Sequence, residues 1–183
     1  MYVAQHINGN QSRLWKTSDS GISWSQVTIP PGNSSRLMLA LDPLDAQKLW
    51  IAYSDGANGN KIFLTTNGGL SFSNLTTPVL NDENVQTMAQ IGGTNGGIYY
   101  CTNQSVYYRN QTMSDWIPLA DSLPTFFSSN LARPFYRDGK IRIASYGKGI
   151  WESEFYEQPA QPVAQISVDQ LQKTFLCVQD TFY

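Results

Sequence analysis

Charged side chains are scarce in this sequence, and the scarcity excludes several kinds of partner. Asp, Glu, Lys and Arg make up 14% of its 183 residues, against about 25% in an average soluble domain. The 12 Lys and Arg nearly balance the 14 Asp and Glu, and no basic block occurs. We therefore expect no nucleic-acid partner, since nucleic-acid binding needs a concentrated positive charge. No apolar run approaches the roughly 18 residues of a membrane span, so we expect no membrane insertion.

Cysteine and histidine, the usual zinc ligands, are almost absent. The only histidine is His6, and the two cysteines, Cys101 and Cys177, lie far apart without a Cys-x-x-Cys pair. We predict no metal site of this kind and a buried free thiol at Cys101. A disulfide between the two cysteines is the less favoured alternative.

Signals of catalysis and of cofactor binding are equally sparse. The sequence shows no nucleophile elbow, no phosphate-binding glycine loop and no metalloprotease helix, and we assign no catalytic residue. The loop from Ser54 to Asn60, SDGANGN, carries oxygen ligands that could hold Ca²⁺. It lacks the acidic cluster of calcium loops, so a glycine-rich hairpin is the favoured interpretation, and no other cofactor is expected.

What the sequence does contain is an internal repeat. Residues 13–24, RLWKTSDSGISW, align without a gap with residues 61–72, KIFLTTNGGLSF, at an offset of 48 residues. A third copy at 105–116, SVYYRNQTMSDW, keeps the aromatic residues but has lost the Asp and the Gly. A second pattern shares this period, with a small residue at one place in four short runs: Ala4 in MYVAQ, Ala52 in LWIAY, Cys101 in IYYCT and Ala144 in IRIAS.

The repeat predicts the fold class. Each unit has the pattern of strand, turn, strand, box, strand, loop and strand, and such four-stranded units are typical of β-propeller blades. We predict an all-β protein of radially arranged blades of four antiparallel strands. The chain begins at the second strand of a blade and its fourth unit has two strands, so we expect the C-terminal part of a larger, incomplete propeller. A complete four-bladed ring is the alternative.

The repeated loops have residue types suited to a tight reversal of the chain. In the first box (residues 17–24) and the second box (65–72), an Asp or Asn can accept backbone N–H groups, and a Thr can add a hydroxyl. Glycine tolerates a positive φ, and the closing aromatic residue can bury a large apolar face. We predict structural roles for these residues and for the last residue of the third box: Thr17, Asp19, Gly21, Ser23, Trp24, Thr65, Asn67, Gly69, Ser71, Phe72 and Trp116. Trp24 is expected to be mostly buried, and the first box to matter more than the third.

The box pattern, Ser/Thr-x-Asp-x-Gly-x-Ser/Thr-Trp/Phe, resembles the Asp-box, or bacterial neuraminidase repeat. This repeat occurs in sialidases, sortilin-like receptor propellers, xyloglucan-degrading hydrolases and a photosystem assembly factor. The first box matches fully, the second has Asn67 in place of Asp, and the third is degenerate. The resemblance covers residues 1–157 and implies a β-propeller whose boxes are structural hairpins at the blade periphery.

The last part of the sequence has a different character. Residues 158–165, QPAQPVAQ, are expected to form a proline-containing linker. Residues 166–183 end in CVQDTFY, which resembles the truncated start of a PKD domain, an immunoglobulin-like β-sandwich. Together with the strand GKGIWESEFYE, this resembles the end of Asp-box propellers in secreted multi-domain bacterial proteins. The resemblance implies a secreted or cell-surface protein whose signal is not in this chain.

The leading functional hypothesis is a non-catalytic binding module for a glycan or protein ligand, because the sequence offers scaffold residues and no catalytic constellation. One alternative is part of a sialidase-like or xyloglucanase-like glycoside hydrolase with catalytic carboxylates partly upstream. Another is a structural spacer that binds nothing.

Overall fold

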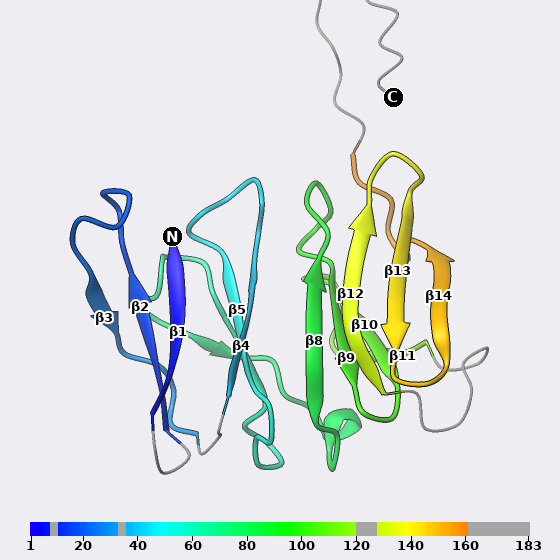
Figure 1. Ribbon diagram of the computed structural model, residues 1–183, viewed down its shortest axis with the longest axis horizontal. Coiled ribbons are helices and arrows are strands. Elements are labelled where there is room, and N and C mark those ends of the chain that lie inside the picture. Colours follow the sequence, from blue (N-terminus) through cyan, green and yellow to red (C-terminus); the bar gives the residue numbers. More distant parts are fainter. Residues whose placement is uncertain (8–10, 33–35, 120–127, 161–183) are drawn as a thin grey trace, which may run out of the picture.

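Four antiparallel β-sheets follow one another along the chain (Figure 1). The computed structural model describes residues 1–7, 11–32, 36–119 and 128–160. Within these residues, helix is confined to one 3₁₀ turn, η1 (Pro78–Leu80), and no helix is long and apolar enough to cross a membrane. The prediction of an all-β fold is confirmed. The expected PKD-like start at 166–183, with Cys177, lies outside the described residues.

In the described residues the two middle sheets have four strands and the two outer sheets have three. Sheet 1 consists of β1 (Tyr2–Ile7), β2 (Gln11–Lys16) and β3 (Ser25–Val27). Sheet 2 consists of β4 (Leu37–Leu41), β5 (Leu49–Tyr53), β6 (Ile62–Thr65) and β7 (Ser73–Asn74). Sheet 3 consists of β8 (Val85–Gln90), β9 (Ile98–Thr102), β10 (Val106–Arg109) and β11 (Ile117–Pro118). Sheet 4 consists of β12 (Ser129–Phe135), β13 (Lys140–Ser145) and β14 (Gly149–Glu154).

Each repeat unit of the sequence contributes strands to two sheets. The last strand of the first unit, β4, pairs with the first strand of the next unit, β5, so that Leu41 lies opposite Leu49. In the same way β8 pairs with β9, and β12 pairs with β13. Sheet 1 accordingly begins with a strand equivalent to the second strand of the middle sheets, as the repeat predicts.

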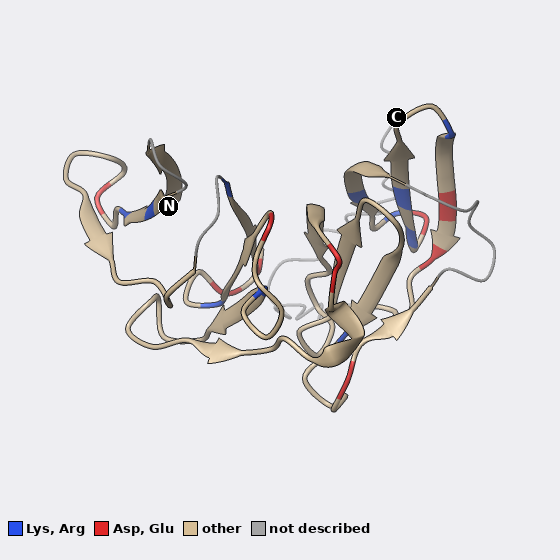
Figure 2. Cartoon of the chain, turned by 90° about the horizontal axis from the view of Figure 1, so that it is seen from below, with Lys and Arg blue, Asp and Glu red and all other residues tan. Residues whose placement is uncertain are grey.

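The sheets stack face to face in an open arc, with sheet 1 at one end and sheet 4 at the other (Figure 2). Three apolar cores lie between successive sheets, and their central residues are Leu14 and Ile51 in the first, Trp50 and Tyr100 in the second, and Tyr99 and Ile143 in the third. Strands β5 and β9 are buried at every position, because both faces of their sheets are covered.

Cys101 lies in this stack as a buried free thiol, as predicted. Burial raises the pKa of its thiol to about 12, which keeps it protonated and unreactive. Ala52, at the equivalent position of sheet 2, is also fully buried. Ala4, which packs toward sheet 2, and Ala144 are only half-buried.

Candidate functional site

The first box folds as a closed network of hydrogen bonds. The Thr17 hydroxyl accepts the backbone N–H of Gly21 at 2.9 Å and donates to the carboxylate of Asp19 at 2.7 Å. The carboxylate accepts the backbone N–H of Ser23 at 2.9 Å and also its hydroxyl. Gly21 has a φ of 94°, which disfavours any side chain with a β-carbon. These contacts hold the loop together from within.

The second box repeats this network with an amide in place of the carboxylate. The Thr65 hydroxyl accepts the N–H of Gly69 at 2.9 Å and donates to Asn67 Oδ1 at 2.9 Å. Asn67 Oδ1 accepts the N–H of Ser71 at 3.0 Å, and its Nδ2 donates to the Ser71 hydroxyl at 2.7 Å. Gly69 has a φ of 93°. The loop geometry therefore tolerates either an Asp or an Asn.

The closing aromatic residues differ in burial, and Trp24 is less buried than predicted. Trp24 is 39% exposed, whereas Trp116 of the degenerate third box is 3% exposed. Phe72 packs on the core between sheets 1 and 2, and Trp116 packs in the core between sheets 2 and 3. Phe72 and Trp116 thus each contact the sheet that precedes their own. Trp24 belongs to sheet 1, and the described residues contain no sheet before sheet 1. The order of burial of these aromatic residues is thus opposite to the expectation that the first box matters more than the third, whose effect on stability stays a prediction.

Acid is expected to weaken the first box and not the second. Hydrogen bonds from the side chain and backbone of Ser23, and then from Thr17, lower the pKa of Asp19 well below its usual range. Since the folded-state pKa is below the unfolded-state value, the ionised carboxylate stabilises the fold above about pH 4, and this contribution is lost as the pH falls further. The melting temperature of the wild type should therefore drop more steeply below about pH 4 than that of Asp19→Asn. Parallel curves of melting temperature against pH would contradict this.

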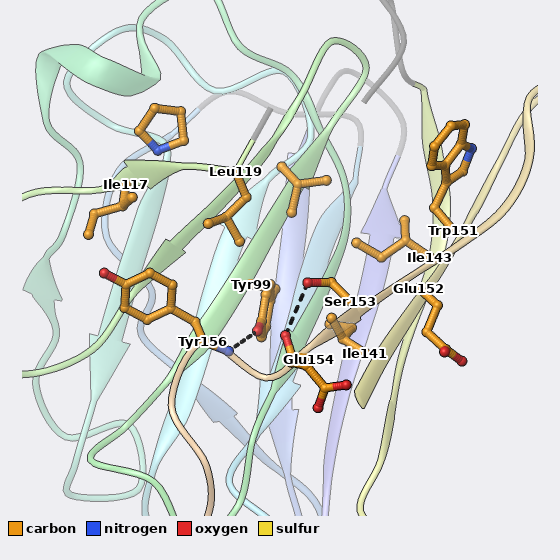
Figure 3. A pocket seen from close by; sticks show the side chains of 12 residues that line it. Tyr99, Ile117, Leu119, Ile141, Ile143, Trp151, Glu152, Ser153, Glu154 and Tyr156 are labelled. Carbon is orange, nitrogen blue, oxygen red and sulfur yellow. Dashed lines mark hydrogen bonds between the residues drawn. The ribbon is translucent and has the colours of Figure 1, made fainter. Parts of the chain in front are cut away.

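A cleft with a volume of about 570 Å³ opens between sheets 3 and 4 (Figure 3). Its lining comes from β9, β10, β11 and Leu119 on the side of sheet 3, and from β13, β14 and Tyr156 on the side of sheet 4. Most of the lining is apolar or aromatic: Tyr99, Val106, Ile117, Pro118 and Leu119 on the side of sheet 3, Ile141, Ile143 and Trp151 on sheet 4, and Tyr156 in the segment after β14. Ligand pockets in proteins are generally lined in this way, by apolar and aromatic side chains with a few polar groups.

The strand β14 borders the cleft, and in the described part of the chain no strand pairs with its outer edge. The backbone N–H of Phe155 donates to the carbonyl of Gly139 at 2.8 Å. In an antiparallel pair, successive backbone N–H groups point alternately toward and away from the partner strand, so this bond shows which N–H groups of β14 face β13. By that alternation the N–H groups of Ile150, Glu152 and Glu154 point away from β13. In sheets 2 and 3 the corresponding edges are paired with the short strands β7 and β11.

The chain after β14 forms a strap (residues 155–160) that joins sheet 4 to sheet 3. Phe155 is buried in the core between these sheets. The Tyr156 N–H donates to the Tyr99 hydroxyl at 2.8 Å, and its ring stacks on Tyr108 with a centroid distance of 4.6 Å. The N–H of Ala160 donates to the carbonyl of Gly93 at 2.9 Å. The first residues of the expected linker, 158–160, thus lie against sheet 3, and 161–165 lie outside the described residues.

Glu157 anchors this strap, and its role was not predicted from the sequence. Its carboxylate accepts the backbone N–H of Asn95 at 2.7 Å, the side-chain amide of Asn110 at 2.7 Å and the hydroxyl of Tyr108 at 3.0 Å. Burial acts to raise the pKa of Glu157, but these three hydrogen bonds outweigh it, and the pKa is lowered. The Tyr-Glu pair at Tyr156 and Glu157, one residue beyond the end of β14, is the signal that could have pointed to it.

Glu152, one of the carboxylates beside the cleft, is not suited to act as a general acid. On the outer face of sheet 4, the Glu152 carboxylate accepts hydrogen bonds from Lys140 Nζ at 2.5 Å and from Arg142 Nε at 2.6 Å. Hydrogen bonds from Lys140 and then Arg142 lower the pKa of Glu152, whereas the general acid of a glycoside hydrolase needs a raised pKa. Lys140 Nζ also forms an ion pair with Glu154 Oε1 at 3.8 Å.

In the loop of residues 54–60, which was considered for Ca²⁺, the carbonyl of Gly56 already accepts a hydrogen bond from the ammonium group of Lys61. Lys61 is 2% exposed, and its Nζ donates to the carbonyls of Gly56 and Glu83, each at 2.7 Å. Asn58 of this loop exchanges two hydrogen bonds with Asp82, which follows η1: its Nδ2 donates to Asp82 Oδ1, and its Oδ1 accepts the backbone N–H of Asp82. No cluster of three His, Cys, Asp or Glu with metal-binding geometry occurs among the described residues. Ca²⁺ binding by residues 54–60 stays the less favoured alternative to the glycine-rich hairpin.

The fold defines the class of the protein as β-propeller-like, and comparisons with solved structures agree. No protein-family profile matches the chain, and no curated protein matches it. A GH74 enzyme of Niastella koreensis superposes with a TM-score of 0.62 at 18% identity, covering 81% of this chain and 25% of that one. YCF48 bound to D1 peptide gives a TM-score of 0.58 at 16% identity, covering 86% of this chain and 56% of that one.

A third similar structure is YCF48 from Cyanidioschyzon merolae, with a TM-score of 0.54 and 17% identity, covering 84% of this chain and 48% of that one. The chain thus spans between about a quarter and just over half of the structures it matches. At these identities the likeness concerns the fold alone, and it supports the predicted propeller architecture.

Proposed function

We propose that this protein is a non-catalytic binding module that takes an extended segment of a partner protein by strand addition to β14. The observation that carries the proposal is that the outer edge of β14, which no strand of the described residues pairs with, lies directly beside an apolar cleft. An added strand would hydrogen-bond to the outward N–H groups of β14, and every second side chain would enter the cleft. The partner segment should therefore alternate apolar and polar residues.

Two further considerations support a protein ligand. The cleft wall is dominated by Ile, Leu, Pro and aromatic side chains, which offer few partners to sugar hydroxyls. One protein with a similar fold, YCF48, has been solved bound to D1 peptide. From the sequence resemblances alone, we also propose that the boxes are Asp-boxes with a structural role and that the protein is secreted or displayed at the cell surface before a PKD-like domain.

The test is a selection of random peptides displayed on phage, followed by affinity measurement with the purified full chain. We expect selected peptides to alternate apolar residues, and Glu154→Pro to weaken their binding at least about tenfold, because proline removes one outward N–H. Glu154→Ala is the matched control, since it removes the side chain and keeps the N–H. A glycan array and a polysaccharide hydrolysis assay are run beside it. Binding of glycans alone, or release of reducing sugar, would overturn the proposal.

A further inference from the structure

We infer that Arg109 and Gln111, in the degenerate third box (residues 109–116), hold a small carboxylate ligand in a second cleft of the molecule. This cleft lies between sheets 2 and 3 and has a volume of about 260 Å³. Its lining comes from β5, β6 and β7 on one side and from β9, β10 and their flanking loops on the other. It shares no lining residue with the proposed peptide cleft, so the inference is independent of that proposal.

The two residues stand where the third box departs from the repeat. In the repeat alignment, Arg109 takes the position of the threonine whose hydroxyl closes the first two boxes, and Gln111 takes that of the Asp or Asn. Met113 takes the position of the glycine with positive φ. The third box therefore cannot form the closed network of the other two. Departure from a repeated structural pattern is expected at functional sites, where another requirement acts on the sequence.

Arg109 is the cationic centre of the cleft. It is half-buried, and its Nη1 donates to the carbonyl of Leu75 at 3.0 Å, the one acceptor that the described residues offer to its guanidinium. None of the ion pairs in the described chain includes Arg109. Burial lowers the pKa of Arg109, against the opposing effect of the Asp115 carboxylate. Because a buried cation is normally paired, the remaining N–H groups of this guanidinium favour an anionic ligand.

The surroundings of Arg109 indicate which anion fits. The planar guanidinium matches the two oxygens of a carboxylate through parallel N–H groups. The carboxylate of Asp115 acts on Arg109 from nearby, so the cleft has little excess positive charge, and a singly charged carboxylate fits better than a doubly charged phosphate. The side-chain amide of Gln111 has no hydrogen-bond partner among the described residues and is available to donate to the same ligand.

The apolar part of the lining determines the rest of the ligand. Trp50, Leu64 and Ile98 are at most 8% exposed, and they present aromatic and aliphatic surface to the cleft. Pockets for drug-sized ligands have volumes of about 300–1,000 Å³, so a cleft of about 260 Å³ takes a smaller molecule. The ligand is a free monocarboxylic acid with a small apolar body, such as one aromatic ring.

The test titrates the full chain with benzoate and with benzamide and follows the NMR signal of the Gly96 backbone amide, which lies at the cleft. The two probes share a ring and have nearly the same size, but only benzoate carries a charge. We expect benzoate to bind with a Kd at least about tenfold lower, because only a carboxylate forms the charge-assisted pair with Arg109. Equal Kd values for the two probes, or binding of benzoate that leaves Gly96 unchanged, would overturn the inference.

A tripeptide tests the other source of a carboxylate, the end of a protein chain. We expect Gly-Gly-Phe with a free C-terminal carboxylate to bind more weakly than benzoate, because its backbone is too large for the small cleft. Tighter binding of the tripeptide than of benzoate would overturn the assignment to a free acid.

Arg109→Thr places in the third box the residue that the first two boxes have at this position. We expect this variant to bind benzoate no better than benzamide, because the guanidinium is gone. Arg109→Lys should be intermediate, since it keeps the charge and loses the fork of N–H groups. Arg137→Thr is the control for the lost charge. The side chain of Arg137 is 86% exposed, so salt screens it, and the preference for benzoate should stay within about twofold of the wild type.

Thermal unfolding shows whether each variant is folded before it is titrated. A folded Arg109→Thr protein that keeps the full preference for benzoate would contradict the role of Arg109. If this variant does not fold, the comparison uses Arg109→Lys, for which an unchanged preference has the same consequence.

Discussion

Replacing Trp116 with alanine should lower the free energy of unfolding by about 3–5 kcal/mol, because a large buried side chain is lost and a cavity is left behind. The indole is 3% exposed in the core between sheets 2 and 3. Its Nε1 donates to the carbonyl of Leu75 at 2.8 Å, and its ring lies 5.5 Å from that of Tyr100. Urea unfolding at neutral pH measures the change.

Trp24→Ala is the matched control for this prediction. Both residues close a box, but Trp24 is 39% exposed and no preceding sheet of the described chain covers it. Its replacement should cost well under half of what Trp116→Ala costs, since less apolar area leaves the core. Equal losses for the two variants would show that burial against the preceding sheet does not decide the contribution of these residues.

Replacing Glu157 with alanine should detach the strap from sheet 3 and destabilise the protein by roughly 1–3 kcal/mol, because three donors lose a charged acceptor. The Asn95 N–H, the Asn110 amide and the Tyr108 hydroxyl all depend on this carboxylate. Peptide binding in the cleft should fall as well, since Tyr156 is held at the cleft wall by the same segment.

Glu157→Gln separates the charge from the shape of this anchor. The amide keeps one acceptor oxygen, so its stability should lie between those of the wild type and Glu157→Ala. The pKa of Glu157 is lowered in the folded state, and the wild type should lose this contribution below about pH 4, whereas the Gln variant should not. Unfolding measured at several pH values checks both points. An alanine variant as stable as the wild type, with unchanged amide exchange at Asn95, would contradict the anchoring role.

The architecture could be predicted from the sequence because it is written in local, repeated features. The spacing of Thr17, Asp19 and Gly21 recurs at Thr65, Asn67 and Gly69, and a turn of this kind depends only on residues within the loop. The four runs around Ala4, Ala52, Cys101 and Ala144 share the period, which indicated the strands and their order. The resulting fold is confirmed by the sheets of the structure.

The burial of Trp24 and the candidate cleft could not be predicted in the same way. The burial of a closing aromatic residue depends on the sheet that precedes it, and that contact lies outside the box. The cleft arises where the strap carries the chain from β14 to sheet 3, through contacts between Glu157 and residues 47 to 62 positions away. Such contacts between distant residues leave no periodic signal in a single sequence.

Strand addition at β14 is tested most directly by amide hydrogen exchange of the full chain with and without a peptide selected by phage display. Binding as proposed predicts added protection at alternate residues, the outward N–H groups of Ile150, Glu152 and Glu154, because these would donate to the added strand. The intervening N–H groups of Trp151 and Ser153 already face β13 and should change little. Tight binding without added protection at the three outward amides would contradict strand addition at this edge.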